Sequence, residues 1–178
     1  MSSNKIKAII RHLWRDESDA RRIIPPAMLQ RLAGRVAASE RLHTGQIRIY
    51  VEAALPLSYL SRLNKPASLQ DIVRQRAVML FGKLQVWDTA QNNGVLIYLL
   101  LAEHAIEIVA DRGLALHVPS DQWQALVARM GSTFGQQRFE GGLGEALEEV
   151  SKLLVAHFPA LPHGAARTNE LPDEPLLG

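Results

Sequence analysis

Cysteine is absent from the 178 residues, which excludes a disulfide framework, a thiolate metal site and a cysteine nucleophile. Neither charge sign is in excess, because 20 basic and 18 acidic side chains give a net charge of +2. That balance does not indicate a nucleic-acid-binding protein. The longest apolar run, residues 95–102, is far shorter than the about 20 residues that cross a bilayer. Residues 1–15 contain no apolar stretch of signal-peptide length, so we expect a cytoplasmic protein.

Several motifs of catalytic chemistry are also missing. The sequence has no G-x-S-x-G nucleophile elbow, no G-x-x-x-x-G-K-[ST] phosphate loop and no G-x-G-x-x-G nucleotide fingerprint. Its 6 histidines form no H-x-x-x-H or H-x-H pair, so zinc is not predicted. What is present is an apolar fraction of 47% over the length of one domain, which supports a real hydrophobic core.

The apolar periodicity predicts the order helix, strand, helix, strand, strand, helix, helix. Pro25 and Pro26 open the first of these helices, since proline is well placed in a first turn. Residues 47–53 alternate apolar and polar side chains, which predicts a strand with one face in water. Ser68 and Asp71 then form a capping box at the start of a long helix.

Residues 95–101 are an unbroken apolar run, typical of a central strand that is buried on both faces. Residues 106–110 follow after a connection too short for a crossover, which predicts an antiparallel hairpin. The predicted fold class is α/β: a three-layer α/β/α sandwich with a small mixed sheet, a central β-hairpin and helices on both faces. We expect an N-terminal helical extension packed on the core at residues 1–43, one α/β/α domain at 44–158 and a flexible tail at 159–178.

Five pieces of the sequence stand in the order of a known family. They are a strand at 46–51 after a Thr44-Gly45 turn, a helix end at 81–87, Asn92-Asn93-Gly94 before an apolar strand, a second strand at 106–109, and a glycine-containing turn at 139–143. In this order the chain resembles the TPM domain, a small α/β/α module of bacteria, plants and animals. The family is often labelled a phosphatase family, and plant members are linked to photosystem repair and acid phosphatase activity.

The resemblance also implies a site and a partner. Some members bind calcium or other divalent ions through aspartates on the loops around the hairpin. Most members have a signal peptide or a membrane anchor, whereas this sequence resembles a short cytosolic bacterial branch that accompanies a longer, membrane-anchored relative. Here Asn92 stands where the family has an acidic residue, and residues 110–121 do not keep the family's glycine-rich stretch. The loss of a carboxylate lowers the affinity for a hard dication.

The candidate metal ligands are Asp88, Asn92, Asp111 and Asp121, whose oxygens are the donor type that Ca²⁺ or Mg²⁺ prefers. We expect them on loops at the carboxyl ends of strands, where a bound dication would polarise a phosphoryl oxygen or activate water. The alternative is structural. Asp88 and Asn92 suit a helix-ending loop, Asp121 suits a helix start, and Asp111 could pair with Arg112 or another base.

Two further features have open interpretations. Glu107 lies within an apolar strand, where it pairs with an arginine, lies at a partly open sheet edge, or acts as a general acid with a raised pKa. Residues 5–15 form a basic amphipathic helix, which either docks on the core or lies on an anionic membrane surface.

The sequence leaves two hypotheses about function. The first is an accessory interaction module whose divalent-cation loop site is degenerate, acting beside a membrane-associated protein or an anionic membrane surface. The second is a divalent-metal-dependent, phosphatase-like hydrolase of the phosphomonoesterase, acid phosphatase-like type. Whether the chain is an enzyme stays open at this point.

Overall fold

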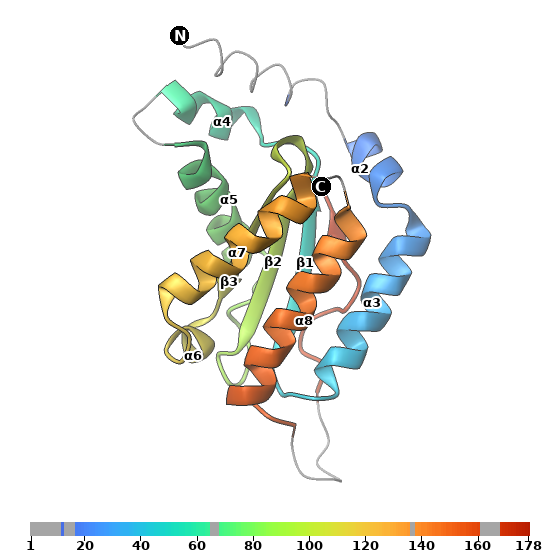
Figure 1. Ribbon diagram of the computed structural model, residues 1–178, viewed down its shortest axis with the longest axis vertical. Coiled ribbons are helices and arrows are strands. Elements are labelled where there is room, and N and C mark those ends of the chain that lie inside the picture. The colour runs from blue at the N-terminus through green and yellow to red at the C-terminus, as the bar shows by residue number, and fades with distance from the viewer. Residues whose placement is uncertain (1–11, 13–16, 65–67, 136–137, 161–167) are drawn as a thin grey trace.

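The computed structural model describes residue 12 and residues 17–64, 68–135, 138–160 and 168–178. Four strands form one mixed sheet between two layers of helices (Figure 1). In chain order the elements are α2 (Glu17–Ile23), α3 (Pro26–Glu40), β1 (Gln46–Glu52), α4 (Leu57–Leu60), the 3-10 turn η1 (Ser61–Asn64), α5 (Leu69–Lys83), β2 (Gly94–Leu100), the 3-10 turn η2 (Leu101–Glu103), β3 (Ala105–Ala110), α6 (Arg112–Ala115), α7 (Ser120–Gly135), α8 (Phe139–His157) and β4 (Leu176–Leu177).

The strand order is β3-β2-β1-β4. Strands β1 and β2 pair in parallel, with Ile49 opposite Ile97, whereas β2 and β3 pair antiparallel, with Ile97 opposite Ile108. The predicted hairpin is therefore confirmed. The β1–β2 connection carries α5 across one face of the sheet, as a parallel pair requires.

Strand β2 is buried along its whole length, as its apolar run predicts. Because neighbouring side chains of a strand point to opposite faces, β2 contributes to two separate hydrophobic cores. Val95, Ile97 and Leu99 pack under α3, α7 and α8, while Leu96, Tyr98 and Leu100 pack under α5. The three-layer α/β/α sandwich is confirmed.

The prediction that β1 has one face in water is wrong. Arg48 and Glu52 are buried and Tyr50 is half-buried, although all three alternate with apolar residues. The reason is that α5 and the C-terminal segment extend over the face that the alternation marks as polar. A strand beside a doubly covered strand is covered as well.

Residues 168–178, part of the segment expected to be a flexible tail, lie against the sheet in the structure. Strand β4 pairs in parallel with β1, with Leu176 opposite Tyr50, and the backbone N–H of Gly178 donates to the carbonyl of Val51 (2.9 Å). The guanidinium of Arg48 donates to the carbonyl oxygens of Pro172 and Glu174. This segment supplies acceptors to a buried charge and covers the edge of β1.

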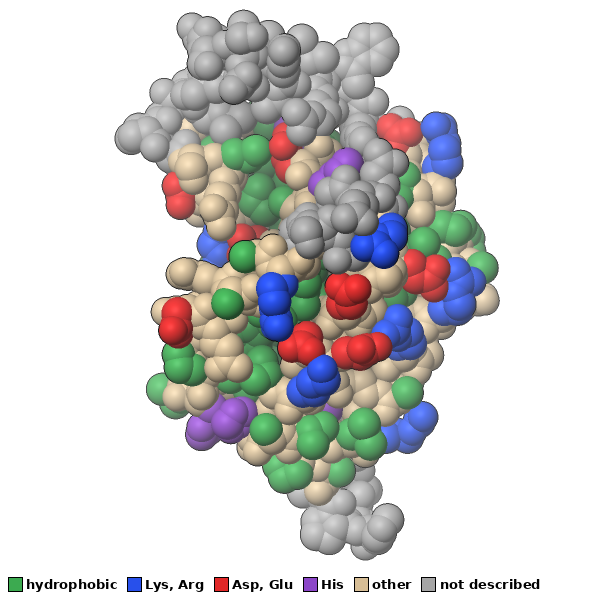
Figure 2. Space-filling model, viewed as in Figure 1, with side chains coloured by type: hydrophobic (Ala, Val, Ile, Leu, Met, Phe, Trp, Pro, Cys, Tyr) green, Lys and Arg blue, Asp and Glu red, His purple; other side chains and the backbone are tan. Residues whose placement is uncertain are grey.

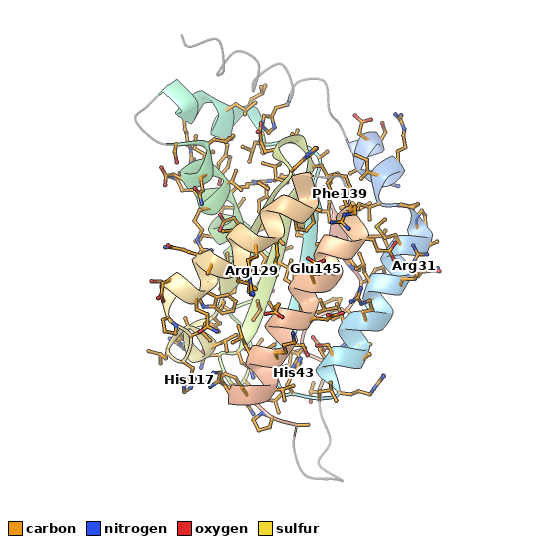
Figure 3. The ribbon with its side chains drawn as sticks, viewed as in Figure 1. Arg31, His43, His117, Arg129, Phe139 and Glu145 are labelled. Atoms are coloured by element: carbon orange, nitrogen blue, oxygen red, sulfur yellow. The ribbon has the colours of Figure 1, made fainter. Side chains whose placement is uncertain are left out.

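Residues 17–43 pack on the sandwich through α2 and α3. The backbone N–H of Ile47 donates to the carboxylate of Glu40 at the end of α3 (2.7 Å). On the outer surface Arg31 of α3 pairs with Glu140 of α8 (2.7 Å; Figure 3). None of the helices in the described part of the chain combines the length and apolar character needed to cross a bilayer.

A chain that ends at residue 169 will unfold at a lower urea concentration than the full chain. The truncation leaves the buried guanidinium of Arg48 without its two carbonyl acceptors, and hydrogen bonds to a charged group contribute about 1.5–3 kcal/mol each. Arg48→Met destabilises the full chain but restores part of the lost stability in the truncated one. An unchanged unfolding midpoint after truncation contradicts this role for the C-terminal segment.

Candidate functional site

Two of the predicted ligands, Asn92 and Asp111, lie on loops at the same end of the sheet. Asn92 precedes β2 and Asp111 follows β3. Because the two strands run antiparallel, these positions share one end, which is the amino end of β1 and β2. Asp111 therefore lies at the carboxyl end of its strand, as expected, whereas Asn92 lies at the amino end of β2.

Asn92 and Asp111 are brought to the same corner by close backbone contacts. The N–H of Gly113 donates to the carbonyl of Asn92 (2.8 Å), and the N–H of Asp111 donates to the carbonyl of Gly94 (2.8 Å). A side chain at position 113 would place its Cβ 2.4 Å from the carbonyl oxygen of Asn92, so glycine is required there. Asn92 itself has φ of 52°, in the left-handed region that asparagine tolerates.

The side chain of Asn92 is bound by an arginine. Arg112 donates to its amide oxygen from Nε (3.0 Å) and from Nη2 (2.8 Å). The oxygen that the sequence offers as a metal ligand therefore already accepts two hydrogen bonds from the guanidinium of Arg112.

Asp111 has one occupied and one unoccupied carboxylate oxygen. Its Oδ1 accepts from the backbone N–H of Arg112 (2.7 Å) and so caps α6. Its Oδ2 is buried and has no hydrogen-bond donor in the part of the chain that the structure describes. Oδ1 thus has a structural role as a helix cap through the backbone of Arg112, whose guanidinium binds Asn92 instead, and Oδ2 retains acceptor capacity.

Asp88 and Asp121 do not join this corner. Both are exposed, and Asp121 lies in the first turn of α7, where its Oδ1 accepts from the N–H of Gln122 (3.0 Å). Within residues 12, 17–64, 68–135, 138–160 and 168–178, no group of three or more His, Asp or Glu side chains is arranged to hold a metal ion. The structure brings Asn92 and Asp111 together and leaves the other two predicted ligands in solvent.

Neutral side chains cross-link the rest of this loop. The hydroxyl of Thr44 donates to the amide oxygen of Gln91 (2.6 Å) and accepts from the amide of Asn93 (3.3 Å). Asn93 is buried, and its backbone N–H donates to the hydroxyl of Thr89 (3.0 Å). His117 lies at this end of the molecule, where its ring stacks on that of His157 (Figure 3). The polar residues of the loop therefore serve mainly to fix its conformation.

The opposite end of the sheet contains a buried ionic network that sequence reasoning missed. The carboxylate of Glu52 accepts from Nε and Nη2 of Arg76 and from the hydroxyl of Tyr98 (2.6 Å). Tyr98 is fully buried and Glu52 is 4% exposed. Burial and the neighbouring Glu52 raise the pKa of Tyr98, while hydrogen bonds and charge from Glu52 raise the pKa of Arg76 against the effect of burial. The apolar run of β2 is the sequence signal that could have predicted this network. A strand buried on both faces implies that its neighbour β1, and with it Glu52, is covered by helices as well.

A second buried pair, His12 and Glu103, lies at the same end of the sheet. The N–H of Leu55 donates to Nδ1 of His12 (3.0 Å), which places the proton of the neutral ring on Nε2. That nitrogen lies 3.0 Å from a carboxylate oxygen of Glu103. His12 is the described residue of the predicted basic helix, and the rest of residues 5–15 lies outside the described part of the chain.

Glu107 pairs with an arginine, as one of its interpretations proposed. Its carboxylate lies 3.3 Å from Nη1 of Arg74, which also donates to the carbonyl of Ile108 (2.6 Å). Burial raises the pKa of Glu107, and the charge of Arg74 opposes that rise. The carboxylate faces α5 rather than the loops at Asn92, so it is separate from that corner.

Glu52→Gln will lower the free energy of unfolding by about 3–5 kcal/mol, because it leaves the guanidinium of Arg76 buried without its partner. Urea denaturation measures the change. Glu149→Gln, at an exposed ion pair on α8, is the matched control and costs less than about 1 kcal/mol. If the two substitutions lower the free energy of unfolding equally, the buried network does not stabilise the fold more than an exposed ion pair does, which contradicts this account.

Glu107→Gln will raise the melting temperature at pH 8 by at most about 4 °C. A gain of ~1 kcal/mol in the free energy of unfolding produces a shift of that size in a domain of this length. The folded chain holds the proton of Glu107 more tightly than the unfolded chain does, so ionisation destabilises the fold above the ordinary carboxyl pKa of about 4.3. The gain therefore disappears as the pH falls below that value.

Glu140→Gln is the control for Glu107→Gln, because it should change stability at neutral pH in the opposite direction. The hydrogen bond from Arg31 lowers the pKa of Glu140, so its ionised form stabilises the fold at neutral pH and that contribution is lost in acid. A destabilising effect of Glu107→Gln at pH 8 contradicts the assignment of the pKa shift to burial.

One family profile and two solved structures are similar to this chain. The profile of the TPM domain matches residues 18–153, so it includes α2 and α3 and begins before the boundary expected at residue 44. The NMR structure of BA42 protein from the psychrophilic bacterium Bizionia argentinensis is similar, with a TM-score of 0.68 and 24% identity over 85% of this chain and 93% of that one. The N-terminal domain of a P. gingivalis protein has a TM-score of 0.54 and 17% identity over 78% and 83% of the two chains.

At these identities the two structures support the fold alone. A search of the curated proteins finds no match. The profile match covers most of the chain, from α2 to α8. The chain therefore belongs to the TPM domain family.

Proposed function

We propose that this TPM domain protein is an accessory interaction module whose cation site on the loops is degenerate. The observation that carries the proposal is the contact of Arg112 with Asn92, in which both guanidinium donors reach one amide oxygen. The loop thus carries its own cation at the place where the resemblance implies a dication.

Two physical effects of this contact weaken a divalent site. The amide oxygen of Asn92 has its hydrogen-bond capacity filled by two charge-assisted bonds of 3.0 and 2.8 Å. A fixed positive charge next to a ligand oxygen also repels a second cation. Calcium binds through six to eight oxygen ligands, several of them anionic. Besides Asp111, the carboxylate of Glu170 reaches this loop and accepts from the N–H of Ala90 (2.8 Å), but no group of three or more such side chains among the described residues is arranged to hold a metal ion.

The second candidate function, a divalent-metal-dependent phosphatase-like hydrolase, is favoured by one specific observation. Oδ2 of Asp111 is buried and accepts no hydrogen bond within the described residues, so it could receive a cation. In that case Ca²⁺ or Mg²⁺ would polarise a phosphoryl oxygen beside Asp111, with Arg112 as a second positive group.

The partner implied by the family resemblance belongs to the same proposal. A membrane-associated protein or an anionic membrane surface would be reached through the basic residues of segment 5–15, which lies outside the described part of the chain apart from His12. The cytoplasmic location and the lack of a nucleic-acid partner stay predictions of the sequence.

Millimolar Ca²⁺ or Mg²⁺ will leave the melting temperature of the full chain unchanged, because a ligand stabilises only the state that binds it. With either ion, the unaltered chain will hydrolyse p-nitrophenyl phosphate no faster than the Asp111→Asn variant does. The double variant Asn92→Asp/Arg112→Ser removes the internal cation and restores a carboxylate, and we expect it to gain stability with Ca²⁺.

Saturable, metal-dependent hydrolysis that is lost in Asp111→Asn contradicts the interaction module and supports the hydrolase. An increase of the melting temperature of the unaltered chain with Ca²⁺, equal to that of the double variant, contradicts the role given to Arg112.

A further inference from the structure

A groove runs along the outer edge of β3, between α5 and α7. We call it the edge groove; it has a volume of about 640 Å³. Ile108 and Ala110 form its floor, Arg74 and Glu107 its polar side, and Trp123 and Val127 its apolar side. The outline of the molecule is indented at the left in Figure 2, between the α5 lobe above and α7 below.

The antiparallel register determines which backbone groups of β3 face the groove. Asp111 donates to Gly94, so the pairs 94/111, 96/109 and 98/107 exchange hydrogen bonds across the β2–β3 ladder. The alternate residues of β3 therefore direct their N–H and C=O groups outward. Those residues are Ile106, Ile108 and Ala110, which together present a strand edge to the groove.

This edge differs from the other edge of the sheet. At the far side, β1 is paired with β4 and with the backbone of Gly178. At β3 the described residues provide no further strand, because β3 is the terminal strand of the order β3-β2-β1-β4. One outward carbonyl, that of Ile108, accepts from Arg74, whose side chain is 47% exposed.

The groove also contains an unpaired donor. Nε1 of Trp123 is buried and has no hydrogen-bond partner within the described residues. A buried indole N–H ordinarily finds an acceptor, and leaving it unpaired costs about 1–3 kcal/mol. A carbonyl oxygen of a bound chain would satisfy it once the indole turns its N–H toward the groove.

The two sides of the groove specify the chemistry of an occupant. The α5 side and the floor carry the carboxylates of Asp71 and Glu107 against one guanidinium, that of Arg74, which leaves a net charge of one negative. Ser68 donates to Asp71 and lowers the pKa of that carboxyl, so it is ionised at neutral pH. The α7 side is apolar at Trp123 and Val127.

We propose that the edge groove binds an extended segment of a partner protein as an added strand beside β3. Main-chain hydrogen bonds to Ile106, Ile108 and Ala110 supply the affinity, as in other cases of strand addition. Because side chains of a strand alternate between faces, the segment alternates apolar residues toward α7 with polar residues toward α5, including a lysine or arginine beside Glu107 and Asp71. This proposal names the partner surface of the interaction module proposed above.

Arg74 changes its hydrogen-bond partners when a strand binds in the groove. In the empty groove its Nη1 satisfies the carbonyl of Ile108, which protects the edge from unspecific pairing. A bound strand donates to that carbonyl instead, and Arg74 keeps its ion pair with Glu107. A whole second copy of the chain is disfavoured as the occupant, because α5 and α7 flank the floor and admit a single extended chain more readily than a folded domain.

The test uses the full chain and an acetylated, amidated ten-residue peptide that alternates valine with lysine and threonine. Amide hydrogen exchange followed by NMR measures each backbone N–H. We expect saturating peptide to slow exchange at Ile106, Ile108 and Ala110 by roughly tenfold or more, while Glu107 and Val109, already in the ladder, change little. A peptide N-methylated at alternate residues loses its backbone donors and should not bind.

Two variants separate binding from folding. Ala110→Pro removes an outward N–H without breaking the β2–β3 ladder and should weaken the peptide roughly tenfold or more, or about 1.4 kcal/mol. Ala110→Val is its control, since it retains the N–H. Trp123→Phe should weaken the peptide while leaving the melting temperature unchanged or higher, because it removes the unpaired donor.

Several results overturn the proposal. They are unchanged exchange at the three amides up to millimolar peptide, equal binding of the N-methylated peptide, and equal binding of a peptide with glutamate in place of lysine. Self-association of the chain that Ala110→Pro abolishes would assign the edge to a second copy instead. Metal-dependent hydrolysis refutes the proposed function without affecting these amides, so the two failures are distinguishable.

Discussion

The structure depends on a strand that cannot face water on either side. Strand β2 is buried at every position, and its alternate side chains divide between two hydrophobic cores. Helices must therefore cover both faces of the sheet, with α5 on one and α3, α7 and α8 on the other (Figure 1). Because the neighbouring strands share these faces, polar side chains on β1 and β3 are covered as well.

Each covered charge is then paired by a residue of a segment that packs on the sheet. Glu52 on β1 is paired by Arg76 of α5, and Glu107 on β3 by Arg74 of the same helix. Arg48 receives carbonyl oxygens from residues 172 and 174, which holds the C-terminal segment beside β1. The ion pairs therefore specify how the outer layers attach to the sheet, whereas apolar burial supplies most of the driving force for folding.

The sequence predicts the layers, the hairpin and the capping box of α5, because these follow from local periodicity and turn residues. It misjudges β1, whose alternation resembles that of a half-exposed strand, because the covering segments come from positions 76 and 172–174. The candidate ligands Asn92 and Asp111 do meet, but the sequence could not show that Arg112 would occupy the oxygen of Asn92. The edge groove was not predicted, because it depends on the register of β3 and on two helices remote in sequence.

Native-state hydrogen exchange at β2 tests the central claim most directly. If the doubly covered strand holds both layers together, the amides of residues 95–100 should exchange only through global unfolding, with an opening free energy equal to that from urea denaturation. Exchange of these amides through a smaller opening, such as detachment of α5 alone, would contradict the account.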